Sequence, residues 1–206
     1  LDEFPEFEKR VIESLRQPLE EGSISVSRAK GTFLFPANCI VVLAMNPCPC
    51  GYLGSKVKSC VCSANDIQKY AKKISGPIID RIDMWIKVSN IDYDTLTHSN
   101  SELNSDEIKE KIIHARNFAK KRFEEGGDNI NLNKNISAKE INKYIKLSDN
   151  AEALMKKLSI SNALSPRAYH RTLRVARTIA DLEGKENIND FHILEAFRYR
   201  GKGFED

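Results

Sequence analysis

The sequence predicts an α/β domain followed by an all-helical domain. The segment 40–45 is a short, continuous run of aliphatic residues that stops at Asn46-Pro47, which is typical of a strand buried on both faces of a parallel sheet. Beyond about residue 105, apolar residues recur at helical spacing. The polar stretch 92–104 between these parts has no periodicity. We therefore expect one domain at 1–92 and a second at 105–206.

Composition limits the class of protein. With 41% hydrophobic and 30% charged residues among 206, the chain has the composition of a soluble globular protein, and a net charge of +3 is too small to indicate a nucleic-acid partner by itself. No apolar run reaches the ~20 residues of a membrane span, and no signal peptide opens the sequence. These observations predict a cytoplasmic protein without a membrane partner. Because the sequence starts at Leu1-Asp2-Glu3, inside a motif, we expect a fragment of a longer polypeptide.

Local signals assign the elements of the first domain. Leu1-Asp2-Glu3 is expected to end a strand, and residues 6–15 to form a helix with Phe7, Val11 and Leu15 on one face, closed by Pro18 and Gly22. Alternation in Ser23–Ser27, a turn at Arg28–Gly31 and an extended Thr32–Phe35 predict a β-hairpin. A helix at 64–73, broken by Ser75-Gly76-Pro77, and a strand at 84–88 complete this half.

The second domain is expected to contain five helices. They cover about 106–124, a short segment through Ile145 opened by a capping box at Ser137, then 150–158, 166–182 and 190–199. Ser165-Pro166 gives the fourth an N-cap and a first-turn proline. Its core stripe should be Ala168, Thr172, Val175, Ile179 and Leu182, with Arg167, Arg171 and Arg174 on the adjacent stripe.

Polar residues at the predicted strand ends are candidates for nucleotide chemistry. Asp2 could hold Mg²⁺ through its water shell, and Glu3 could polarise an attacking water as a general base. Asn46, at the carboxyl end of the central strand, could hold a water or a phosphate oxygen. The alternatives are an exposed acidic pair before a helix and a turn-forming asparagine.

Basic residues offer further candidates, each with a structural alternative. Arg81, flanked by Asp80 and Asp83, either forms a structural salt bridge or reaches a neighbouring subunit's γ-phosphate. Arg167, near a helix N-terminus, either contacts phosphate or lies on a solvated face. Arg28 and Lys30 at the hairpin tip either contact a phosphate backbone or are simply solvated.

Four of the five cysteines form two close pairs, which in an intracellular chain favours a metal over disulfides. Cys48-Pro49-Cys50 and Cys60-Val61-Cys62 can supply four thiolates to a tetrahedral zinc ion if the intervening loop folds back. Reduced thiols without a ligand are the alternative. Cys39 is expected to be a core residue.

The order of these motifs resembles an AAA+ ATPase, and specifically the magnesium-chelatase-like family (YifB/ComM type), over essentially the whole chain. The resemblance is based on four sequence segments: Leu15-Arg16-Gln17-Pro18-Leu19-Glu20, Ser27-Arg28-Ala29-Lys30-Gly31-Thr32, Asn46-Pro47-Cys48-Pro49-Cys50-Gly51-Tyr52 and Val175-Ala176-Arg177-Thr178-Ile179-Ala180-Asp181-Leu182.

The resemblance implies a role for each candidate. It implies a partial P-loop NTPase-type α/β core and a helical lid, with Asp2-Glu3 as Walker B, Asn46 as sensor 1, Arg81 as an arginine finger acting in trans and Arg167 as sensor 2. The hairpin at 23–35 would be the pre-sensor-1 hairpin that grips substrate in the pore of a hexameric ring. ATP and Mg²⁺ are the implied cofactors.

One departure from the family pattern is large. No G-x-x-x-x-G-K-[S/T] loop occurs in the sequence, so we expect these residues alone to bind ATP poorly and to hydrolyse none. The first strands of the nucleotide fold are expected to be missing with that loop, and because a sheet that lacks strands exposes an edge, we also expect these residues to self-associate. The leading hypothesis is an ATP-driven, competence-related motor on DNA, of the helicase, branch-migration or recombination type. A magnesium-chelatase-type ATPase that remodels a partner protein is the second. A zinc-stabilised interaction module without catalytic activity is the third.

Overall fold

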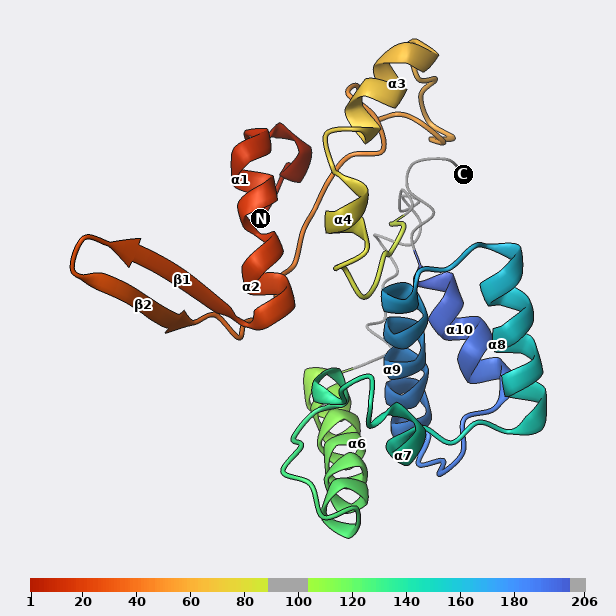
Figure 1. Ribbon diagram of the computed structural model, residues 1–206. Coiled ribbons are helices and arrows are strands. Elements are labelled where there is room, and N and C mark those ends of the chain that lie inside the picture. Colours follow the sequence, from red (N-terminus) through yellow and green to blue (C-terminus); the bar gives the residue numbers. More distant parts are fainter. Residues whose placement is uncertain (89–103, 201–206) are drawn as a thin grey trace. The chain divides into compact units, whose positions relative to one another are not determined.

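The computed structural model describes residues 1–88 and 104–200 (Figure 1). These residues form two compact units, which we describe separately. Among the described residues, the first contains residues 1–82 and 87–88, and the second contains residues 104–200 together with Asp83–Ile86. The predicted domain boundary at 92–104 falls almost entirely outside the described residues.

In the first unit, the chain start lies parallel to the predicted central strand. The Leu1 amino group donates to the Val42 carbonyl at 2.8 Å, and the Ala44 N–H donates to the Leu1 carbonyl at 2.9 Å. The Phe4 N–H then donates to the Ala44 carbonyl at 3.0 Å. This alternation of donors and acceptors is the pattern of two parallel strands, although the pairing is short.

The prediction that the segment 40–45 is buried on both faces is wrong. Leu43 and Met45 pack on a core of Phe4, Ile12, Ile74 and Ile78, whereas Ile40 and Val42 are 88% and 72% exposed. Side chains of an extended segment alternate between its faces. Among the described residues, only one of those faces is covered.

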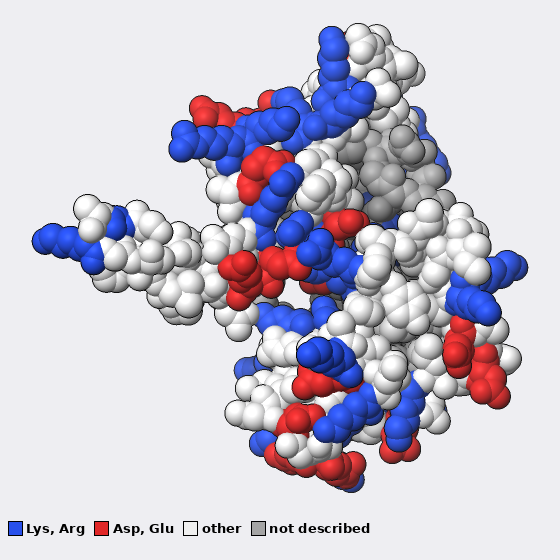
Figure 2. Space-filling view, viewed as in Figure 1, with Lys and Arg blue, Asp and Glu red and all other residues white. Residues whose placement is uncertain are grey.

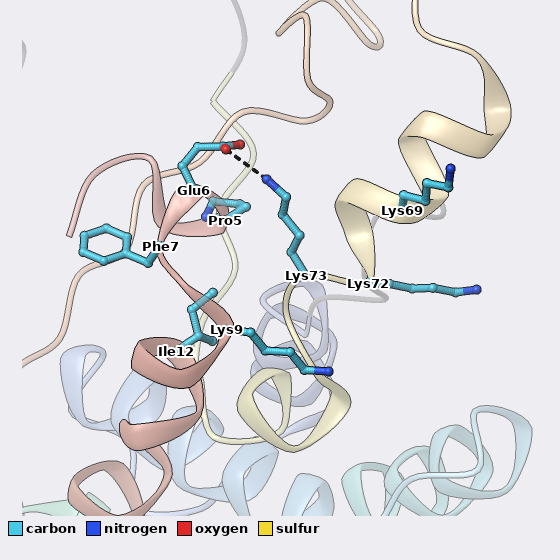
Figure 3. A pocket seen from close by; sticks show the side chains of 8 residues that line it. All are labelled: Pro5, Glu6, Phe7, Lys9, Ile12, Lys69, Lys72 and Lys73. Carbon is cyan, nitrogen blue, oxygen red and sulfur yellow. Dashed lines mark hydrogen bonds and ion pairs between the residues drawn. The ribbon is translucent and has the colours of Figure 1, made fainter.

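The helix expected at 6–15 is also different. A 3₁₀ turn at Phe4–Glu6 is followed by α1 (Lys9–Ser14) and α2 (Arg16–Glu21). Ile12 is the buried residue of α1, at 1% exposure (Figure 3). Of the predicted apolar stripe, Leu15 is half-buried against the same core, whereas Phe7 and Val11 are exposed, so the prediction is wrong for those two residues. Pro18 lies in the first turn of α2, where its missing N–H has no intrahelical partner to lose, and therefore does not end the helix. Gly22, with φ at 62°, does end it.

The remaining elements of the first unit follow the predicted order. β1 (Ser23–Arg28) pairs antiparallel with β2 (Gly31–Pro36), and Arg28 opposite Gly31 closes a two-residue turn. α3 (Ala64–Ala71) begins with a capping box between Ser63 and Asp66, and the predicted break at Ser75-Gly76-Pro77 is the start of a further short helix, α4 (Gly76–Ile79). The strand expected at 84–88 is absent. The Trp85 N–H instead donates to the Tyr199 carbonyl at 2.8 Å, within the second unit.

The second unit is helical, as predicted. Its helices are α6 (Ser105–Glu125), α7 (Ile141–Tyr144), α8 (Asp149–Ser161), α9 (Pro166–Leu182) and α10 (Asp190–Arg198), with a 3₁₀ turn at Asn133–Asn135. Ser165 caps α9 as expected, because its Oγ accepts from the Ala168 N–H at 3.1 Å. At Ser137 the backbone N–H bonds the Glu140 carboxylate at 2.9 Å, yet the helix starts only at Ile141.

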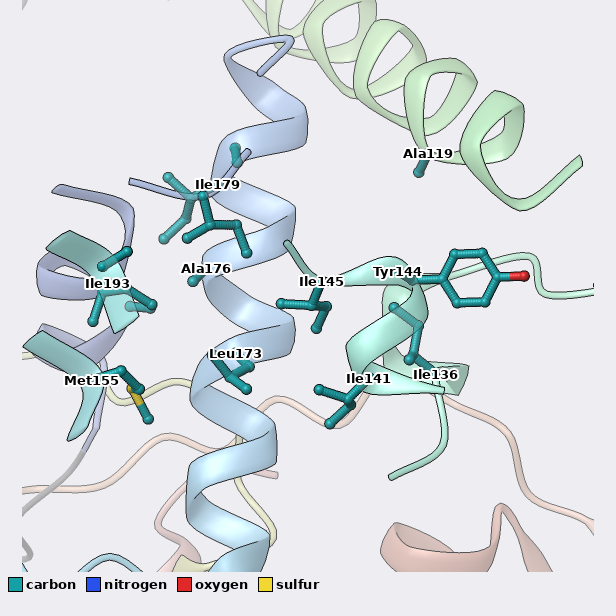
Figure 4. Close-up of a cluster of buried hydrophobic side chains, with 14 of the residues drawn as sticks. Ala119, Ile136, Ile141, Tyr144, Ile145, Met155, Leu173, Ala176, Ile179 and Ile193 are labelled. Atoms are coloured by element: carbon teal, nitrogen blue, oxygen red, sulfur yellow. The ribbon is translucent and has the colours of Figure 1, made fainter. Parts of the chain in front are cut away.

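Helix α9 is the centre of this unit and contacts α6, α10 and the 3₁₀ turn (Figure 4). Of the predicted stripe, Ala168, Thr172 and Ile179 are buried and Val175 is half-buried, whereas Leu182 is 49% exposed. Contact on several sides widens the buried surface. It therefore also includes Leu173, Ala176 and Ala180.

An ion network that was not predicted from the sequence lies at the carboxyl end of α9. Arg177 is fully buried, and its Nε donates to Asp181 Oδ1 at 3.0 Å. Arg122 from α6 donates to both Asp181 oxygens, at 2.6 and 2.9 Å, and the Asn133 amide donates to Oδ2 at 2.7 Å. Arg177 also donates to the carbonyls of Lys185 and Glu186. Burial lowers the pKa of Arg177, and Asp181 opposes that effect.

Candidate nucleotide site and metal centre

The residues expected to act on a nucleotide lie at the carboxyl ends of two paired segments in the first unit. Asp2 and Glu3 come directly after Leu1, and Asn46 comes two residues after Ala44. Because Leu1 and Ala44 belong to the parallel pairing, all three side chains lie at the carboxyl edge of the paired segments. All three are exposed. Carboxylates and an amide at that edge can bind a hydrated cation and a phosphate oxygen.

Two local contacts fix this edge. Glu3 adopts a left-handed backbone conformation, with φ at 48° and ψ at 41°, which is uncommon outside glycine and occurs often at functional sites. Its N–H donates to Asp2 Oδ1 at 2.9 Å. The Asn46 backbone N–H bonds the hydroxyl of Tyr70 from α3, and burial, with Glu6 nearby, raises the pKa of that hydroxyl. Tyr70 therefore anchors the backbone of Asn46, a contact for which the sequence offers no signal.

Arg81 follows α4 and forms contacts inside the first unit. Its Nε lies 2.9 Å from Glu20 Oε2 on α2, its Nη1 donates to the Pro77 carbonyl at 2.7 Å, and its side chain is 13% exposed. A role in a neighbouring subunit therefore requires the Glu20 contact to open. Both interpretations of Arg81 remain predictions.

Arg167 and the hairpin residues occupy the positions expected for them. Arg167 is exposed in the first turn of α9, in the second unit. Arg28 ends β1 and Lys30 lies in the turn, and both are exposed. Figure 2 shows blue side chains at the end of the hairpin and no red ones along it, in agreement with a segment from Ser23 to Pro36 that contains no acidic residue.

The four paired cysteines converge, as the sequence predicted. Cys48 Sγ lies 3.5 Å from Cys50 Sγ and 3.7 Å from Cys60 Sγ, and Cys50 Sγ lies 3.6 Å from Cys60 Sγ. Together with Cys62, all four sulfurs lie within 4.8 Å of one another. A tetrahedral zinc ion with Zn–S bonds of ~2.3 Å requires S···S separations of about 3.8 Å. The four residues thus fit a zinc ion with small movements. Cys39 is exposed and outside the cluster, so its expected place in the core is wrong.

The electrostatics of the cluster also suit a cation. Backbone N–H groups of Tyr52 and Val61 lower the pKa of Cys50 to about 6, whereas burial raises the pKa of Cys62 to about 12. The Leu53 N–H points at Cys48 Sγ at 3.3 Å, a donor that stabilises a thiolate. Neighbouring sulfurs oppose one another's ionisation, and a divalent cation among them removes that opposition.

Comparison with known proteins assigns the family. Residues 1–96 match the family described as magnesium chelatase, subunit ChlI, and residues 102–200 match the subunit ChlI C-terminal family. The chain belongs to the magnesium-chelatase-like family. It is 39% identical over 202 residues to the competence protein ComM of Haemophilus influenzae, and 34% and 33% identical to YifB of Escherichia coli and of Salmonella typhimurium.

Each of these alignments covers 97% of the chain and 38% of the relative, so the chain spans well under half the length of the proteins it matches. In the described part of the chain, no helix is both long and apolar enough to cross a membrane.

Proposed function

We propose that the intact protein is an ATP-driven AAA+ motor that acts on DNA as a hexameric ring. In this proposal the chain contributes the second half of the nucleotide site, the substrate-contacting hairpin and the helical lid. The observation that carries the proposal is the parallel pairing that brings Asp2, Glu3 and Asn46 to one edge. Family membership supports ATPase chemistry, and the name of the ComM relative supports a role in competence.

Each residue at this edge has a defined task in the proposed mechanism. Asp2 holds the water shell of Mg²⁺, which when bound neutralises charge on the phosphates. The Glu3 carboxylate accepts a hydrogen bond from the attacking water and orients it toward the γ-phosphate. The Asn46 side chain donates to that water or to a phosphate oxygen. Because neither carboxylate pairs with a basic side chain within the described residues, both are available for this work.

Two further arginines would complete the site. Arg81 from a neighbouring subunit stabilises charge on the transferred phosphoryl group, a contribution of ~10³–10⁵ in rate. Arg167 contacts phosphate from the lid. The Cys48–Cys62 loop, which begins two residues after Asn46, is proposed to bind zinc and to support the position of that residue.

Subunit mixing tests the trans role of Arg81. In the intact protein, Arg81→Ala and Glu3→Gln should each abolish turnover and leave nucleotide binding nearly unchanged. A mixture of the two variants should regain part of the turnover, because some interfaces then combine an intact Glu3 with an intact Arg81. Glu20→Gln is the control, since it removes the observed partner of Arg81. If Glu20→Gln loses as much turnover as Arg81→Ala, and the mixture of Arg81→Ala with Glu3→Gln regains none, the role of Arg81 is structural.

Alanine substitution at the hairpin tip tests the DNA contact. Arg28→Ala/Lys30→Ala should weaken DNA binding and reduce its salt dependence, because a protein that meets fewer phosphates releases fewer counterions when it binds. Lys156→Ala/Lys157→Ala on α8 is the control, because it removes the same charge from two exposed positions of the second unit. Equal effects of both pairs would refute a specific role of the tip.

A magnesium-chelatase-type ATPase that remodels a partner protein remains the second candidate, on the family match alone. It predicts turnover that responds to a partner protein and is indifferent to DNA.

A further inference from the structure

The chain crosses from the first unit to the second almost directly after Arg81. Residues 1–82 belong to the first unit, whereas Asp83–Ile86 belong to the second, so the crossing lies between Ile82 and Asp83. Asp83 is therefore only two residues from Arg81. Two residues of extended chain span at most about 7 Å, so a displacement of Asp83 is passed to Arg81 with little slack.

On the first-unit side of the crossing, the chain is fixed to α4. The Arg81 N–H donates to the Ile78 carbonyl at 2.9 Å, and the Ile82 N–H donates to the Ile79 carbonyl at 3.2 Å. Ile82 also packs on the core of the first unit. The Arg81 Nε lies 2.9 Å from Glu20 Oε2. In this state Arg81 is engaged inside its own subunit.

On the second-unit side of the crossing, the chain is fixed to α9 and to the residue that follows α10. Arg171 Nη1 on α9 donates to Asp83 Oδ1 at 2.5 Å. The Arg171 side chain is 11% exposed and that of Asp83 is 59% exposed, so water reaches the pair from one side only. The Trp85 N–H donates to the Tyr199 carbonyl at 2.8 Å. Of these two attachments, the Asp83–Arg171 ion pair is the one nearer to Arg81.

Arg171 lies one helical turn after Arg167. The two residues are four positions apart on α9, so their side chains leave the helix on the same side. The backbone hydrogen bonds of the helix fix this spacing, and a displacement of α9 therefore moves both arginines together. A phosphate that draws Arg167 also draws Arg171 and its partner Asp83.

We propose that Asp83 and Arg171 are positioning residues that link the helical lid to the arginine finger. When Arg167 contacts a phosphate and α9 moves, the ion pair draws Asp83 with the helix. That movement releases Arg81 from Glu20 and frees it for the neighbouring subunit. The inference rests on the proposed function and deepens it, because a trans role of Arg81 requires the Glu20 contact to open.

The test measures ATP turnover and nucleotide affinity of the intact protein. Asp83→Ala should lower kcat about fivefold or more, the lower end of the coupling found between sites in proteins. It should not weaken nucleotide affinity, because binding then no longer has to break the contact with Glu20. Glu124→Ala on α6 is the control, since it removes the acid of another exposed ion pair in the second unit, with Lys120 at 3.6 Å. That control should retain the wild-type kcat.

Removal of Glu20 gives a readout that a purely structural role of Asp83 would not move. If the ion pair acts by opening the contact between Arg81 and Glu20, the loss of Glu20 makes the ion pair unnecessary. Glu20→Gln/Asp83→Ala should therefore recover most of the turnover that Asp83→Ala loses, with Glu20→Gln alone as the reference. A double variant as slow as Asp83→Ala would overturn the inference.

The two positioning residues should also act as one unit. Arg171→Ala should lower kcat at least as much as Asp83→Ala, and the double variant should lose no more than Arg171→Ala alone. Losses that multiply would mean that the two residues act separately, which would contradict the inference. Thermal unfolding verifies that each variant is folded. Because Asp83 is exposed, Asp83→Ala keeps the test valid even if Arg171→Ala unfolds.

Subunit mixing separates failure of the inference from failure of the proposed function. Asp83→Ala mixed with Glu3→Gln should exceed the mean of the separate activities, whereas Asp83→Ala mixed with Arg81→Ala should not, because both then lack a delivered arginine. A wild-type kcat in Asp83→Ala, while Arg81→Ala and Glu3→Gln still complement each other, would refute the inference and leave the motor proposal standing. No recovery in any mixture would refute the trans arginine of the proposed function, and the inference with it.

Discussion

Replacement of one cysteine of the cluster tests whether the loop is a metal centre. The S···S separations among Cys48, Cys50 and Cys60 are 3.5–3.7 Å, close to the ~3.8 Å of a zinc tetrahedron, and Cys62 Sγ lies within 4.8 Å of the other three, so metal binding requires mainly a modest shift of Cys62. Little free energy is then spent on rearrangement. With zinc at ~1,000 times its dissociation constant, the bound metal stabilises the fold by ~4 kcal/mol.

Metal content and thermal unfolding of the intact protein provide the assay. The wild type should contain about one zinc per chain, and a chelator should lower its melting temperature. Cys48→Ser should lose the metal and its response to chelator. Cys39→Ser is the matched control, because Cys39 is exposed and outside the cluster, and it should retain both. Zinc-free wild-type protein, or equal metal content in the two variants, would refute the metal centre.

Acid should release the metal, since zinc binds thiolates and not thiols. The pKa of Cys50 in the metal-free cluster is about 6, so its thiolate is present above that pH and protons compete with zinc as the pH falls through it. Zinc affinity measured from pH 8 to pH 5 should decrease monotonically. Affinity independent of pH over this range would contradict thiolate ligation.

Two further substitutions test the packing of the second unit. Asp181→Asn removes the charge that compensates the fully buried Arg177, and should destabilise the unit by ~3–5 kcal/mol in thermal or denaturant unfolding. Retention of the wild-type melting temperature would disprove that compensation. Gly126→Ala would place a methyl group 2.5 and 2.8 Å from ring carbons of Tyr144 and should cost ~1–3 kcal/mol, whereas Gly76→Ala meets no atom within 4 Å. Equal effects of the two would show that the ring of Tyr144 yields freely.

Local chemistry predicted some elements accurately. Ser165-Pro166 located the start of α9, and the alternation in Ser23–Ser27 with the turn at Arg28–Gly31 located the hairpin, because capping and turn residues act over a few neighbours. The cysteine spacing predicted a convergence that the structure confirms.

Properties set by distant contacts could not be predicted in the same way. Burial of the segment at 40–45 depends on which other segments cover it, and its sequence does not report them. The buried pair of Arg177 and Asp181 depends on Arg122, 59 residues before Asp181. A signal did exist there, since the two charged residues are spaced i, i+4 and each directly follows an alanine, Ala176 or Ala180, that is buried.

ATP turnover by the intact protein, with and without forked DNA across a salt series, tests the central proposal most directly. The motor proposal predicts strong stimulation by DNA that fades as salt rises, and loss of that stimulation in Arg28→Ala/Lys30→Ala. Turnover that is indifferent to DNA at every salt concentration would contradict it.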